Sequence, residues 1–166
     1  MMKKSLLPRL KKIKMLATDV DGVLTDSGMY YSERGDELKK FNTRDGMGMV
    51  LLRNAGYKLA IVTSEDTKIV ERRAAKLKIT DLVQGARDKV HAMELLMKRH
   101  SLTWEEVAYI GDDVNDLEVM GRVGFAATPA DGTEQNKKIA HYITKKKGGE
   151  GCVRELCDIL LSLEKI

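Results

Sequence analysis

Asp19 and Asp21 are the residues whose types and spacing most clearly indicate chemistry. They follow a short, largely apolar run, Ile13-Lys14-Met15-Leu16-Ala17-Thr18, which has the character of a buried parallel strand. Alternate residues of an extended chain project to the same side, and Gly22 permits a tight turn with exposed N–H groups. One carboxylate could therefore attack an electrophile while the other moves protons. A divalent cation between them would reduce their repulsion.

Three more polar features follow predicted strands or begin a predicted helix. They are Thr63-Ser64, Lys89 and the segment Gly111-Asp112-Asp113-Val114-Asn115-Asp116. Each alone has an ordinary explanation: a helix cap, an exposed lysine, or acidic groups that satisfy helix N-terminal amides. Together with the two aspartates they supply a nucleophile, a proton carrier, hydroxyl donors, a fixed cation and a metal-binding carboxylate. Phosphoryl transfer needs this set, because its catalysis is mostly positioning and charge neutralisation.

Alternating strands and helices are predicted to position these residues. The predicted strands lie near 13–18, 58–63, 82–83, 107–110 and 125–127, and the helices near 46–54, 67–76, 89–99 and 153–163. Asp45 is the expected cap of the first helix, and a polar turn within Met29–Asn42 predicts a β-hairpin. The pattern predicts an α/β fold: a doubly wound, Rossmann-like parallel sheet with helices on both faces. We expect one domain over 1–166, with a hairpin insertion at about 27–42 and the site at the carboxyl ends of the strands.

Composition excludes several classes of function. The net charge is only +4 and aromatic residues make up 5% of the chain, which argues against nucleic-acid binding. No segment approaches the roughly 20 apolar residues that a membrane-spanning helix requires. The basic segment Met1–Lys14 has too short an apolar run for a signal peptide. Cys152 and Cys157 lack redox or zinc spacing, so we expect two reduced thiols and a cytoplasmic protein.

The four motifs, in this order, resemble those of the haloacid dehalogenase superfamily over nearly the full chain. The resemblance implies that Asp19 is the nucleophile and forms an aspartyl-phosphate. It implies that Asp21 protonates the leaving alcohol and then activates water, while Thr63 and Lys89 hold the phosphoryl group and Lys89 also pairs with Asp19. Ser64, beside Thr63, is a further candidate for binding phosphate or substrate.

The same resemblance implies a Mg²⁺ site. The ion would bind Asp112, a carboxylate oxygen of Asp19 and the backbone carbonyl of Asp21, with Asp113 and Asp116 in support. Such a hard cation prefers a few carboxylates plus water.

Too little chain lies between the predicted strands for a cap domain, so the capless branch of the superfamily is indicated. Several strings resemble its 3-deoxy-D-manno-octulosonate 8-phosphate and nonulosonate (KDN or sialic acid) 9-phosphate phosphatases. They are Asp19–Asp26, Phe41–Gly46, Gln84-Gly85, Ala108–Asp113 and Gly148–Gly151. This resemblance implies a homotetramer built through the hairpin, with a neighbouring subunit covering the site, and a role in lipopolysaccharide or sialic acid synthesis.

One departure leaves the substrate open. Octulosonate phosphatases usually follow the strand-end Thr with Gly-Arg, whereas this chain has Ser64-Glu65. Glu65, Arg73 and Lys76 could contact the sugar acid, as in the nonulosonate members, or could form an exposed charged helix face.

Two other functions compete with a sugar-acid phosphatase. One is a non-catalytic phosphatase-like module that serves oligomerisation in CMP-sugar-acid synthesis, which would be expected to lose catalytic residues. The other is a general small-molecule phosphatase. An EF-hand is excluded because Tyr30 stands where the loop requires its final Glu. A receiver domain is disfavoured because it places its acidic pair, its phosphorylated Asp and its Lys in a different order.

Overall fold

The protein is built on a six-stranded parallel sheet. The computed structural model describes residues 4–35 and 37–163. The sheet order is β5-β4-β1-β6-β7-β8, so β1 lies between β4 and β6 at the centre. The strands are β1 (Met15–Thr18), β4 (Lys58–Val62), β5 (Asp81–Val83), β6 (Val107–Ile110), β7 (Phe125–Thr128) and β8 (Tyr142–Ile143). The order reverses beside β1, which is where doubly wound folds bind ligands.

Helices cover both faces of the sheet, and each face has its own apolar core. Along β1, Leu16 packs into the core under α2 (Thr43–Asn54), α3 (Lys68–Leu77) and α7 (Cys152–Leu163). Met15 and Ala17 pack into the opposite core, under α4 (Lys89–His100) and α5 (Leu117–Arg122). Apolar residues therefore alternate between two buried faces, which explains the nearly continuous apolar strands of the sequence. The predicted doubly wound fold is confirmed.

The remaining elements are short. Residues 4–10 form η1 (Lys4–Leu6) and α1 (Leu7–Leu10), and three more short helices are η2 (Trp104–Glu106), η3 (Val114–Asp116) and α6 (Glu134–Ile139). None of the helices in the described ranges is long and apolar enough to cross a bilayer. The sequence pattern did not reveal α5, α6 and β8, all of which are only two to six residues long.

The start of α2 differs from the prediction. The helix begins at Thr43 rather than Gly46, because the side chain of Asn42 caps it by accepting a hydrogen bond from the Arg44 N–H at 2.8 Å. Asp45, the expected cap, is instead buried in the first turn and accepts a hydrogen bond from the Arg154 N–H at 2.7 Å. It therefore joins α2 to α7.

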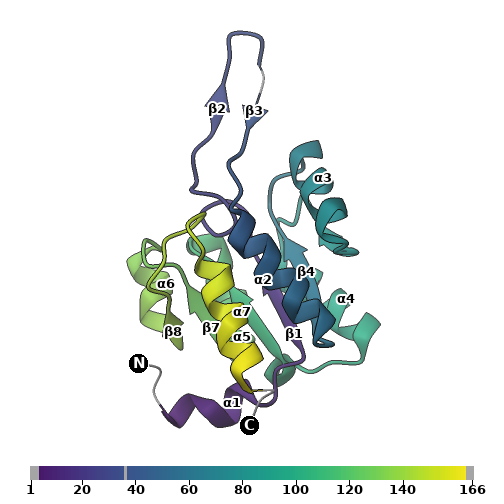
Figure 1. The fold of residues 1–166 in the computed structure, drawn as a ribbon, viewed down its shortest axis with the longest axis vertical. Coiled ribbons are helices and arrows are strands. Elements are labelled where there is room, and N and C mark those ends of the chain that lie inside the picture. The colour runs from purple at the N-terminus through teal and green to yellow at the C-terminus, as the bar shows by residue number, and fades with distance from the viewer. Residues whose placement is uncertain (1–3, 36, 164–166) are drawn as a thin grey trace.

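A hairpin projects from the carboxyl edge of the sheet (Figure 1). Its strands are β2 (Tyr30–Tyr31) and β3 (Glu37–Leu38), paired antiparallel and shorter than the predicted Met29–Asn42 hairpin suggested. The described residues between β1 and β4 form only this hairpin and α2, and those between β4 and α4 form only α3 and β5. The expected lack of a cap domain is confirmed for the described chain.

Candidate active site

The predicted motifs meet at the carboxyl ends of three neighbouring strands. Asp19 follows β1, Thr63 follows β4, and Asp112 lies two residues beyond β6. Their side chains share a cavity of about 230 Å³. Its lining consists of Asp19, Asp21, Ser27, Met29, Thr63, Ser64, Glu65, Asp112, Asp113 and Asn115. The structure therefore brings most of the predicted residues together.

Asp19 is buried at the bottom of this cavity. Its Oδ1 accepts a hydrogen bond from the Val20 N–H at 2.7 Å, and its Oδ2 lies 2.8 Å from the Nζ of Lys89. Burial and the nearby Asp116 carboxylate raise the pKa of Asp19 to about 7, although Lys89 opposes the shift. Its ionised form is therefore costly in the protein alone and would be stabilised by an added cation.

Lys89 is shared between two aspartates. It opens α4, where Asp88 caps the helix by accepting a hydrogen bond from the His91 N–H at 2.9 Å. Its Nζ lies 2.7 Å from Asp116 as well as 2.8 Å from Asp19. Burial alone would lower the pKa of Lys89, but the two carboxylates outweigh it and raise that pKa. Lys89 is thus a fixed positive charge beside Asp19.

Tyr109 completes this network, and sequence reasoning missed it. The fully buried Tyr109 on β6 donates its hydroxyl hydrogen to Oδ1 of Asp116 at 2.6 Å. The other Asp116 oxygen accepts the Asp112 N–H at 3.0 Å. Both oxygens of Asp116 are therefore occupied, so this residue supports the site rather than facing the cavity.

Asp112 supplies the best support for a metal ion. Carboxylate oxygens of Asp19, Asp112 and Asp116 lie within 4.8 Å of one another. Among the described residues, Oδ1 of Asp112 is buried and has no hydrogen-bond partner. Burial and the neighbouring carboxylates, Asp19 first, raise the pKa of Asp112 to about 8. Gly22, at φ +82°, brings the turn so close that a Cβ there would collide with the Asp112 carboxylate. Three carboxylates facing one lysine leave excess negative charge, and hard oxygen donors of this kind fit Mg²⁺.

Asp21 is held from a different direction. Its two carboxylate oxygens lie 2.7 and 2.8 Å from the Nζ of Lys39, which comes from the base of the hairpin. Lys39 is the second functional candidate that sequence reasoning missed. The β-prone pattern of the segment predicted a hairpin, but nothing in it indicated which lysine would turn inward.

Thr63 and the two residues after it form the part of the cavity wall that follows β4. Thr63 is buried and its Oγ1 accepts the Glu65 N–H at 3.3 Å. The hydroxyl of Ser64 accepts a hydrogen bond from the Asn115 side chain at 3.3 Å, which joins this wall to η3. Glu65 is exposed and lines the cavity.

Arg73 and Lys76 are not brought to this cavity. The Arg73 guanidinium lies over the Phe41 ring, 5.4 Å from its centroid, and donates to the Asn42 carbonyl at 2.9 Å. Burial lowers the pKa of Arg73, with Asp45 opposing the shift. Lys76 is exposed on α3. Within one chain the predicted sugar-acid contacts are therefore reduced to Glu65, and Arg73 has a structural position between α3 and α2.

The glycine-rich segment Lys147–Gly151 packs against the aspartate turn of its own chain. A Cβ at Gly148 would collide with the Gly22 carbonyl. The Gly149 N–H donates to the Val23 carbonyl at 2.9 Å, and the Gly149 carbonyl accepts from the Asn42 side chain at 3.0 Å. Contacts within one chain therefore explain why glycines stand here.

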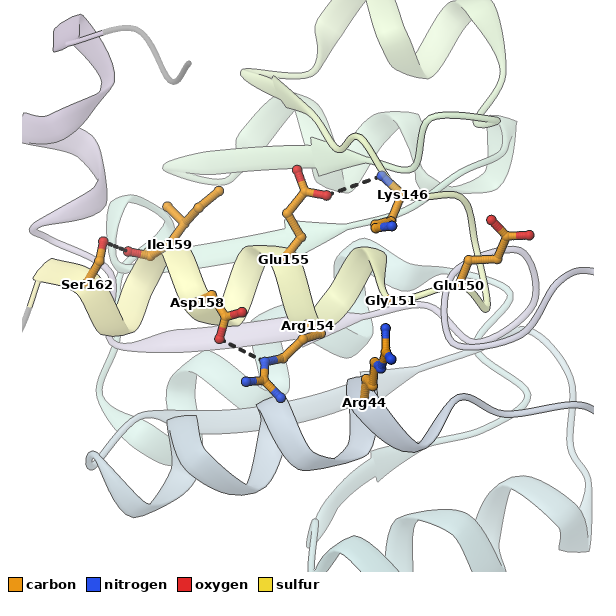
Figure 2. Close-up of a pocket in the computed structure, with 9 residues that line it drawn as sticks. All are labelled: Arg44, Lys146, Glu150, Gly151, Arg154, Glu155, Asp158, Ile159 and Ser162. Carbon is orange, nitrogen blue, oxygen red and sulfur yellow. Dashed lines mark hydrogen bonds and ion pairs between the residues drawn. The ribbon is translucent and has the colours of Figure 1, made fainter.

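A larger hollow of about 670 Å³ lies along α7 and the loop that precedes it, and Arg44 of α2 also lines it (Figure 2). Figure 2 shows an ion pair of Arg154 with Asp158, and Glu155 bound to the Lys146 N–H, so much of its charge is already matched. It contains none of the predicted catalytic residues. The smaller cavity over Asp19 has the reactive groups and is the candidate active site.

Comparisons with known proteins agree with this assignment. Residues 58–156 match the haloacid dehalogenase-like hydrolase family. The chain is 43% identical over 155 residues to the 3-deoxy-D-manno-octulosonate 8-phosphate phosphatase KdsC of Yersinia pestis, covering 93% of this chain and 83% of that protein. The corresponding protein of Escherichia coli K12 is 41% identical, with 93% and 82% covered.

Solved structures give the same picture. A structure of a putative 3-deoxy-D-manno-octulosonate 8-phosphate phosphatase from Vibrio cholerae has a TM-score of 0.96 and 42% identity, covering 99% of this chain and 92% of that one. The phosphatase from Moraxella catarrhalis, solved with magnesium ion, phosphate ion and a KDO molecule, has a TM-score of 0.93 and 39% identity, with 95% and 91% covered.

Proposed function

The chain belongs to the haloacid dehalogenase-like hydrolases, and from this premise we propose that it is a Mg²⁺-dependent phosphatase of a 2-keto-3-deoxy sugar acid. The observation that carries the proposal is the buried Asp19, held 2.8 Å from Lys89 beside the partner-free oxygen of Asp112. The named relatives favour 3-deoxy-D-manno-octulosonate 8-phosphate over a nonulosonate 9-phosphate as the substrate.

In the first half of the proposed reaction, Asp19 is the nucleophile. A carboxylate oxygen of Asp19 attacks phosphorus, and the bond from phosphorus to the sugar oxygen breaks. Lys89 orients Asp19 and offsets charge on the phosphoryl oxygens, while Thr63 and Ser64 offer hydroxyl donors from the end of β4. Protonated Asp21 gives its proton to the departing sugar oxygen, so that an alcohol leaves rather than an alkoxide.

In the second half, water hydrolyses the aspartyl-phosphate on Asp19. Asp21, now a carboxylate, takes a proton from the attacking water. The products are inorganic phosphate and the regenerated Asp19 carboxylate. Asp21 lines the cavity, which supports a role in both halves.

Mg²⁺ would be held by the carboxylates of Asp19 and Asp112 and by the backbone carbonyl of Asp21. When bound, it supplies positive charge that offsets repulsion between these carboxylates and the phosphoryl oxygens. Asp116, whose oxygens are both occupied, and Asp113 would support this set rather than bind the ion.

We propose that a second copy of the chain covers the open site. Four apolar side chains on the hairpin are between 42% and 65% exposed: Met29, Tyr30, Tyr31 and Leu38. Such a group on a projecting element is typical of an interface. A homotetramer built through the hairpin would bury these four side chains and bring a partner's charged side chains over the cavity. Of the predicted contacts to the sugar acid, this chain places only Glu65 there.

We also propose that residues 1–166 act as one domain in the cytoplasm. Two cores that share one sheet and two unpaired buried cysteines fit this proposal.

Phosphate release from three classes of substrate tests the function. We expect kcat/KM to be highest for 3-deoxy-D-manno-octulosonate 8-phosphate, lower for a nonulosonate 9-phosphate and lowest for hexose phosphates, and activity to vanish with a chelator. Equal rates on all three would indicate a general phosphatase. No release with or without Mg²⁺ would indicate a non-catalytic module.

A further inference from the structure

Lys39 has an unusual environment for a lysine next to a hairpin. It follows β3 directly, yet its side chain is 0% exposed, whereas the carboxylate that it binds, Asp21, is 31% exposed and lines the cavity. Lys39 itself does not line the cavity. The ammonium therefore lies behind Asp21 and leaves the front of the carboxylate open to a substrate.

The next residue provides an internal comparison. Lys40 also pairs with an aspartate of the same turn, Asp26, at 2.6 Å, but its side chain is 61% exposed. Exposed pairs of this kind contribute little, because water screens them and the side chains lose freedom. A buried ammonium in contact with both oxygens of a carboxylate is instead directional and resists displacement.

Both ends of the hairpin contact the active site. Met29, at the start of the hairpin, lines the cavity, and Lys39, at its end, binds Asp21. Within the turn, Oδ1 of Asp21 also accepts a longer hydrogen bond, at 3.4 Å, from the hydroxyl of the buried Thr25. The shorter contacts of Asp21, with Lys39, come from the projecting hairpin, so the orientation of Asp21 is tied to the position of that hairpin as well as to the turn.

We propose that Lys39 is a positioning residue that orients Asp21 for proton transfer and couples that orientation to the hairpin. This inference rests on the proposed function, because it assigns Asp21 the proton-transfer role. With its ammonium on both oxygens, Lys39 holds the carboxylate toward the cavity, ready to take a proton from water in the second half of the reaction. A displaced hairpin would withdraw Lys39 and leave Asp21 with only the longer hydrogen bond from the Thr25 hydroxyl among these contacts.

The first test separates kcat from KM. Lys39→Met keeps an unbranched side chain of nearly the same length and removes the charge, and Lys40→Met is the matched control. With the sugar-acid phosphate and Mg²⁺, we expect Lys39→Met to lower kcat about tenfold or more, within the range of general acid–base effects, and to leave KM within about twofold. We expect Lys40→Met to match the wild type in both. An unchanged or raised kcat, or a raised KM with unchanged kcat, would overturn the proposal; the last outcome would make Lys39 a substrate contact.

The second test does not depend on turnover. Amide hydrogen exchange of the hairpin is measured in the metal-free protein for Lys39→Met, Asp21→Asn, the double variant and Lys40→Met. We expect each of the first two to speed exchange in the hairpin, and the double variant to add little, because all three remove the same pair. Exchange in Lys39→Met no faster than in Lys40→Met, or fully additive effects, would overturn the coupling. If the wild type releases no phosphate, the proposed function fails, and this exchange experiment still decides whether Lys39 joins the hairpin to Asp21.

Discussion

Asp19 and Asp21 are two residues apart, yet different parts of the molecule hold their carboxylates. Lys89, from α4 in the packed body, binds Asp19, and both side chains are almost fully buried. Lys39, from the base of a projecting hairpin, binds Asp21, which remains partly exposed. The proposed nucleophile is therefore fixed by the core of the fold. The proposed proton carrier has its shortest contact with a small insertion and only a 3.4 Å hydrogen bond from Thr25 of its own turn.

The largest expected effect comes from replacing Asp19, the aspartate that Lys89 binds. We expect Asp19→Asn to lower kcat by at least about a thousandfold, because an amide cannot form the aspartyl-phosphate. Thermal unfolding should shift little or upward, because the substitution removes a buried charge whose ionisation is costly. Phosphate release and circular dichroism measure the two effects. Asp21→Asn is the comparison: it should retain more activity on an aryl phosphate, whose leaving group needs no proton, than on the sugar-acid phosphate. Wild-type rates in Asp19→Asn would refute the assignment of the nucleophile.

The second effect concerns the metal ion. We expect Asp112→Asn to raise the Mg²⁺ concentration for half-maximal activity by about tenfold or more, because it replaces a charged ligand by a neutral one. Mg²⁺ should also raise the melting temperature of the wild type, since a ligand at 100 times its Kd adds about 2.7 kcal/mol to the free energy of unfolding. Calorimetry and activity titrations measure both. Lys39→Met, on the hairpin side, should leave Mg²⁺ affinity unchanged. If Asp112→Asn and Lys39→Met lost Mg²⁺ affinity equally, the sheet and the hairpin would not have separate roles at the site.

The sequence predicts the residues at the ends of the sheet strands better than it predicts those of the hairpin. Strand–helix alternation and the residues at the strand ends predicted Asp19, Thr63, Lys89 and Asp112, because parallel strands bring their carboxyl ends together whatever the details of packing. Lys39 was not predictable in this way. Its partner is set by the register and twist of two-residue strands, and a slip of one residue would turn Lys40 inward instead.

Two other residues show different limits. Tyr109 lies in a predominantly apolar strand. A tyrosine there is interpreted as an ordinary core residue unless the hydrogen-bond partner of its hydroxyl is known. For Arg73 the sequence left two alternatives open, a contact with the sugar acid or an exposed charged helix face, because α3 carries charge over most of its surface. Its periodicity therefore could not show that the Arg73 face turns toward Phe41 and α2.

The third prediction concerns the contact that supports the aspartate turn from the C-terminal side. We expect Gly148→Ala to destabilise the protein by about 1–3 kcal/mol and to lower kcat about tenfold, because the new methyl group would push the Gly22 carbonyl away and shift Asp21. Gly121→Ala on α5 is the control: a Cβ there meets no atom within 4 Å, and alanine favours a helix, so stability should be unchanged or higher. Chemical denaturation and steady-state kinetics measure the two. If Gly148→Ala loses stability but keeps its kcat, the turn tolerates the shift.

The fourth prediction uses the pKa values of Asp19 and Asp112. Asp19 and Asp112 have pKa values of about 7 and about 8 in the folded protein, against 3.8 for an ordinary aspartate side chain. The folded state therefore binds more protons than the unfolded state between these values. The contribution of these two groups to stability is fully present below about pH 4 and is lost as the pH rises toward about 8, by up to about 1.4 kcal/mol per pH unit for each titrating group. The melting temperature of the metal-free protein should fall from about pH 5 to about pH 8, and saturating Mg²⁺ should flatten the curve. A metal-free melting temperature that rises over this window would contradict the prediction.

The smallest expected effect lies outside both regions, at Glu65. This residue lines the cavity but contacts neither aspartate, so its charge should act on the part of the substrate remote from phosphorus. We expect Glu65→Arg to shift the ratio of kcat/KM values toward the octulosonate phosphate, relative to the nonulosonate phosphate, by about fivefold, which corresponds to about 1 kcal/mol. The rate on an aryl phosphate should not change. Glu71→Arg makes the same change of charge on the exposed face of α3, away from the cavity, and should leave the ratio unchanged. An equal shift in both variants would mean that the ratio responds to the net charge of the protein, and an unchanged ratio in Glu65→Arg would mean that Glu65 faces solvent rather than the substrate.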